Sequence, residues 1–109
     1  MDSMVKVLEM ADLPAAELAS IVKQGAILRL PYLEGRLLQA REHIKSFTEQ
    51  YGTTLHDLRA QGLPERAGYA MHEDFIEWEY WSDILQETEI VVKNVKALLE
   101  KLEDAGDVR

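Results

Sequence analysis

The sequence predicts an all-α protein, an antiparallel helical hairpin or bundle with one long C-terminal helix. Three observations predict this fold class. Apolar residues recur every three or four positions over two long stretches, residues 31–51 and 72–104. The second of these stretches contains neither glycine nor proline. Gly52 and Gly62 stand where predicted helices would end, which is the usual role of glycine after a helix.

The N-terminal segment is expected to contain one short helix. Residues 4–10 fit either a short strand or an extended arm, because valines alternate there with other residues. Asp12 is suited to cap a helix that runs to about Gln24. Gly25 is then expected to end this helix.

A second helix is predicted from Pro31 to Tyr51. Proline is tolerated in the first turn of a helix, where its missing N–H has no partner to lose. Apolar side chains then follow at alternating spacings of four and three, which keeps them on one face for about five turns. These side chains are Leu33, Leu37, Ala40, Ile44, Phe47 and Tyr51.

Two further helices complete the prediction. Thr54 and Asp57 resemble a capping box that opens a short helix to Gln61, and a long helix follows from about His72 to Asp104. At 1.5 Å per residue the long helix would measure roughly 48 Å, against roughly 18 Å for the first helix and roughly 32 Å for the second. Either the first two helices lie end to end along the long one, or a second copy of the chain covers its remaining length in a homodimer.

The composition fits a single helical domain over residues 1–109, with no cysteine and a net charge of −8. Residues 53–109 carry −7 of this charge. Direct contact with nucleic acid is therefore not expected, whereas a basic protein partner is expected. No export signal or membrane-spanning stretch is recognised, and a cytoplasmic protein is expected.

The sequence lacks the strong signatures of an enzyme. It has no phosphate-binding loop, no nucleophile elbow and no zinc-protease motif, so neither catalysis nor a cofactor is expected. His72 with Glu73 and Glu77 comes nearest to a metal site, but paired Glu-x-x-His motifs on two helices are missing. No metal is therefore expected.

Residues 73–89 stand out, because they hold seven acidic residues, no basic residue and four of the eight aromatics. One interpretation places the rings in the core and the acids in water. The other is a binding surface, in which the rings supply buried area and the acids attract a basic partner. On the second interpretation the expected partner-binding residues are Phe75, Glu77, Trp78, Glu79, Tyr80, Trp81 and Asp83.

Two segments resemble small helical antitoxin-like proteins from prokaryotic toxin–antitoxin loci. They are Phe47-Thr-Glu-Gln-Tyr-Gly-Thr-Thr-Leu-His-Asp-Leu58 and His72-Glu-Asp-Phe-Ile-Glu-Trp-Glu-Tyr80, the latter followed by a charged helix. The resemblance covers roughly residues 40–104. It implies a protein that neutralises a small basic toxin, commonly a ribonuclease. The residues that it places at or near the toxin interface are Phe75, Glu77, Trp78, Glu79, Tyr80 and Trp81.

The expected function is therefore a non-enzymatic, antitoxin-like inhibitor of a basic partner. The alternative is a self-associating helical bundle with a structural or adaptor role, for which the two apolar seams suffice and the acidic segment only maintains solubility.

Overall fold

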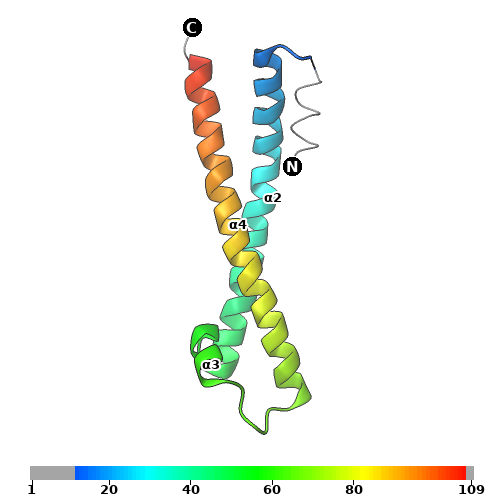
Figure 1. Ribbon diagram of the computed structural model, residues 1–109, viewed down its shortest axis with the longest axis vertical. Coiled ribbons are helices and arrows are strands. Elements are labelled where there is room, and N and C mark those ends of the chain that lie inside the picture. Colours follow the sequence, from blue (N-terminus) through cyan, green and yellow to red (C-terminus); the bar gives the residue numbers. More distant parts are fainter. Residues whose placement is uncertain (1–11, 108–109) are drawn as a thin grey trace.

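The computed structural model describes residues 12–107 and shows an all-α antiparallel hairpin (Figure 1). Helix α2 spans Ala15–Tyr51, α3 spans Leu55–Gln61 and α4 spans Tyr69–Asp107. The long helices α2 and α4 cross near their middles, and α3 lies beside the end where α2 finishes (Figure 1). This confirms the predicted fold class. The predicted strand or arm at residues 4–10 lies outside the described residues.

The helix ends follow the predicted capping residues at three of five positions, Gly25 being one of the two exceptions. Gly52 ends α2 with φ at 63°, and its N–H donates to the Thr48 carbonyl. The Thr54 side chain accepts from the Asp57 N–H at 3.1 Å and so opens α3, and Gly62 closes it. Asp12, however, is not a cap, because α2 begins directly after Pro14, with no side-chain cap bond.

The predicted break in the first half of the chain is wrong. Residues 15–51 form one helix that runs through both Gly25 and Pro31. The apolar seam shows why, since Ala26 and Leu30 continue the spacing of Leu33 toward the N-terminus without a change of phase. Pro31 is solvent-exposed, so the local cost of a missing N–H falls on the outer surface, where water can satisfy the freed carbonyl.

The core lies at the closed end and in the middle of the hairpin. One cluster joins all three helices around Trp78 and Trp81, and a smaller one joins α2 to α4 around Leu37 and Val92. Leu55 and Leu58 of α3 contribute to the first cluster. Every buried residue in the described chain belongs to these clusters except Thr88, on the α4 side.

Replacing Pro31 with alanine is expected to stabilise the protein by up to about 3 kcal/mol, because it restores an N–H donor for the Ile27 carbonyl and removes a clash in the helix interior. Urea unfolding followed by circular dichroism, at fixed protein concentration, measures the change. Pro64→Ala in the loop before α4 is the control and should lower stability by less than about 1 kcal/mol. An unchanged or lower stability of Pro31→Ala would contradict a helix that is continuous through residue 31.

Candidate protein-binding surface

The aromatic acidic segment, residues 73–89, forms the first half of α4. A helix places residues three and four apart on the same face, so the segment divides into an inner and an outer side. The predicted site residues therefore do not all lie together.

The two tryptophans face inward and hold α4 against α2. Trp78 is 1% exposed and stacks on Phe47 and Tyr51, with ring centroids 5.6 and 6.0 Å away. Trp81 is also buried and stacks on His43 at 4.1 Å, the two rings being nearly parallel. Both rings are core residues of the hairpin in this structure.

Phe75 and Glu79 are also occupied within the chain. Phe75 is half-buried against the core cluster. Glu79 pairs with Arg59 at 3.0 Å, which ties α4 to α3. These two residues contribute to the packing of the closed end and leave less of their surface for a partner.

Tyr80 lies at the surface, 50% exposed. Its ring meets Trp81 edge-on, with centroids 5.2 Å apart, and its hydroxyl accepts a hydrogen bond from Arg36 at 3.3 Å. The Trp81 ring and the Arg36 guanidinium cover part of Tyr80, and the exposed half of the residue is available to a partner.

Tyr80 belongs to a row of exposed residues on the outer side of α4, with successive spacings of three and four. We call this row, together with Glu77, the acidic ridge. Its members are Glu73, Ile76, Glu77, Tyr80, Asp83 and Glu87. Three of the seven predicted site residues, Glu77, Tyr80 and Asp83, thus lie in it. Ile76 is 63% exposed and was missed, although its position one turn before Tyr80 could have identified it.

The carboxylates of this segment divide into those with partners and those without. Asp74 accepts hydrogen bonds from Tyr51 and Gln50 at the end of α2, and Glu89 pairs with Arg41 at 3.5 Å. In contrast, the four acids of the ridge form no ion pair with any described residue. The ridge is therefore a strip of uncompensated negative charge around two exposed apolar side chains.

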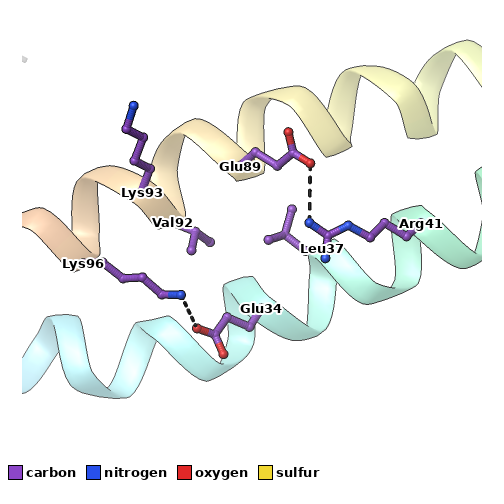
Figure 2. Close-up of a pocket in the computed structure, with 7 residues that line it drawn as sticks. All are labelled: Glu34, Leu37, Arg41, Glu89, Val92, Lys93 and Lys96. Atoms are coloured by element: carbon purple, nitrogen blue, oxygen red, sulfur yellow. Dashed lines mark hydrogen bonds and ion pairs between the residues drawn. The ribbon is translucent and has the colours of Figure 1, made fainter.

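The other side of the hairpin carries paired charges (Figure 2). An open pocket of about 520 Å³ lies between α2 and α4, with Leu37 and Val92 at its base. Glu34 pairs with Lys96 across it, as Arg41 does with Glu89, each at 3.5 Å. These exposed bridges link the two helices but contribute little stability each.

The histidines do not form a site with other ligands. His43 is stacked on Trp81, whereas His56 and His72 are exposed on α3 and at the start of α4. Within residues 12–107 no three histidine or acidic side chains come together as metal ligands. No helix of the described chain is long and apolar enough to cross a membrane.

Comparison with known proteins finds no family model that matches the chain, and no curated protein or solved structure with significant similarity to it. The chain is classed by its fold alone, as an antiparallel helical hairpin.

Trp78→Ala is expected to lower the free energy of unfolding by about 3 to 5 kcal/mol, because it empties the centre of the core. Chemical unfolding measures this loss. The matched change on the outer side, Tyr80→Ala, should cost less than about 1 kcal/mol, since it removes one exposed ring. Equal losses at the two positions would contradict the assignment of inner and outer sides.

The hydrogen bond from Tyr51 to Asp74 predicts a pH dependence of stability. This bond, then burial, then the Asp74 charge raise the pKa of Tyr51 above its ordinary value of 10.0. Because the pKa of Tyr51 is higher in the folded chain than in the unfolded chain, the protonated hydroxyl stabilises the fold. This stabilisation is complete below pH 10 and is lost as the pH rises through the pKa of Tyr51 in the folded chain. Tyr51→Phe should therefore lower stability by about 1 kcal/mol at neutral pH.

Unfolding of the original and the Tyr51→Phe chain in urea, from neutral pH to about pH 11, measures this difference. The difference should shrink at the alkaline end, where both chains lack the bond. A difference that stays constant over the whole range would contradict a stabilising role for the tyrosine proton.

Proposed function

We propose that this protein is a non-enzymatic binding module that inhibits a small basic protein through the acidic ridge of α4. The mode of action is antitoxin-like, and the partner class is a basic toxin such as a ribonuclease, acting in the cytoplasm. The observation that carries the proposal is the ridge itself, with four carboxylates that form no ion pair within residues 12–107, around the exposed Ile76 and Tyr80.

The chemistry of the ridge selects a basic protein. Residues 73–89 carry seven negative charges and no positive one, which repels phosphate backbones and attracts Lys and Arg side chains over a distance of about 10 Å at moderate salt. The Tyr80 ring offers a flat face on which an arginine can stack, while neighbouring carboxylates accept its hydrogen bonds. Ile76 adds apolar area beside it.

The scaffold lowers the entropic cost of binding. The ridge lies on a continuous helix, and Trp78 and Trp81 anchor the opposite side of that helix in the core. A surface held in its bound geometry loses little conformational freedom when a partner docks, so more of the interaction energy appears as affinity. This favours an inhibitor that binds tightly and without rearrangement.

Exposure and ion pairing decide which of the predicted site residues are suitable for substitution. Glu79 is unsuitable because its change would also remove the pair with Arg59, which links α4 to α3. Glu77, Tyr80 and Asp83 are exposed and can be changed together as Glu77→Lys, Tyr80→Ala and Asp83→Lys. A control with the same chemical changes elsewhere is Tyr69→Ala, Glu100→Lys and Asp104→Lys, all at exposed positions of α4.

The experiment is a pull-down from the native host with the original chain, the ridge variant and the control variant as bait. The original and the control should retain the same small basic protein, and the ridge variant should lose it. Retention should also weaken as salt is added, because the attraction is electrostatic. The retained protein, expressed alone, should arrest growth, and the original chain but not the ridge variant should restore it.

Two results would overturn the proposal. One is a bait that retains no basic protein in any form. The other is equal retention by the ridge variant and the original, which would place the binding site elsewhere on the hairpin.

A further inference from the structure

The hairpin has a half without a buried core of its own. All ten buried residues of the described chain lie between Leu33 and Val92. None of residues 15–32 of α2 or 93–104 of α4 is buried, and we call these two segments the open arm. The helices diverge toward this end (Figure 1). Most of the stability of a helix in a protein comes from the packing of its apolar side, so a partner that covered the open arm would stabilise it.

The exposed area of the chain indicates how much surface is uncovered. The chain exposes 8595 Å², whereas a compact monomer of 12.5 kDa would expose about 6,200 Å². Its radius of gyration is 20.3 Å, against about 13 Å for a compact chain of 109 residues. The excess, about 2,400 Å², is larger than the roughly 800 Å² that each subunit buries in a standard stable interface.

One side of the hairpin gathers exposed apolar side chains. The Arg36 guanidinium donates a hydrogen bond to the Tyr80 hydroxyl and lies near the Trp81 ring. Arg36 on α2 and Tyr80 on α4 therefore lie on the same side of the hairpin. Tyr32 precedes Arg36 by one turn, and Val91 follows Tyr80 by three turns. Both therefore lie on the side that Arg36 and Tyr80 define.

We call this side the apolar face. On α2 it carries Ile21, Leu28 and Tyr32, which are 50, 79 and 54% exposed. On α4 it carries Val91 and Leu98, seven residues apart and 44 and 39% exposed. The opposite side instead holds the Glu34–Lys96 and Arg41–Glu89 pairs (Figure 2).

We propose that a second copy of this chain covers the apolar face. The two copies pack arm against arm about a two-fold axis, so that the same residues of each meet, and four helices complete one bundle. The acidic ridges then lie toward the far ends of the dimer, away from the shared arms.

The nearly balanced charge of the open arm favours a second copy of the chain over a basic partner. Residues 15–32 carry one acid and two bases, and residues 93–104 carry three of each, so two arms meet without net repulsion. The first half of α4, with seven acids and no base between residues 73 and 89, would repel its own copy. The nearly neutral open arm is suited to self-association, and the acidic ridge to a partner of opposite charge.

This inference does not depend on the proposed function. The apolar face and the acidic ridge follow one another along the same side of α4 but share no side chain, and dimerisation is measured with the purified chain alone. Either proposal can therefore fail while the other stands.

The test is the mass of the purified chain in solution, by light scattering after size exclusion, over a wide range of protein concentration. The original chain should show twice 12.5 kDa. The double variant Leu28→Glu and Val91→Glu should show half of that mass, because it places two carboxylates in the apolar face. The matched control, Ile27→Glu and Ile90→Glu, changes the neighbouring exposed residues, which point to other sides, and should stay dimeric.

A second measurement does not require the charged variant to fold. Because the chain has no cysteine, Leu28→Cys and Ile27→Cys each introduce a single thiol for reaction with a maleimide. In a lone hairpin position 28 is the more exposed of the two, at 79 against 49%, and should react faster. In the proposed dimer the order reverses.

An original chain that remains at 12.5 kDa at all concentrations, with the thiol at position 28 reacting faster, would overturn the proposal. Equal dissociation of the double variant and its control would also overturn it, because the interface would then lie on another side of the hairpin.

Discussion

The packing of two indole rings between the long helices is the interaction on which the rest of the structure depends. Trp78 and Trp81 are the largest side chains of the core, and they contact three aromatic residues of α2. Aromatic rings bury the most area per residue and stack with a defined geometry, so this contact sets which side of α4 turns inward. The position of every carboxylate along the first half of α4 follows from it.

The consequence is a hairpin with two different ends. At the closed end α3 caps the tryptophans, and Arg59 of α3 reaches back to Glu79. Toward the open arm the aromatic layer gives way to Leu37 and Val92, and beyond them no described side chain is buried. Stability within this chain is thus concentrated at one end, because hydrophobic stabilisation scales with the area that is removed from water.

The distribution of charge follows the same division. Asp74 accepts hydrogen bonds from α2 and Glu89 pairs with Arg41, whereas the acids of the ridge pair with no residue that the structure describes. An acidic surface and a nearly neutral apolar surface therefore coexist on one small chain. Each disfavours the partner that the other attracts, which would allow a dimer to form without blocking the ridge.

The amino-acid sequence by itself determined the helical class, the long last helix and the stop at Gly52, because these depend on local periodicity and backbone preferences. It also identified residues 73–89 as unusual. Local rules failed at Gly25 and Pro31. The apolar seam continues from Leu30 to Leu33 on a single helix, and the packing of this seam outweighs the poor helix propensity of the two residues. Only the tertiary structure decided which aromatic residues lie inside and which acids are paired. Trp78 and Tyr80 are two positions apart with similar chemistry, and what separates them is the direction in which α2 lies.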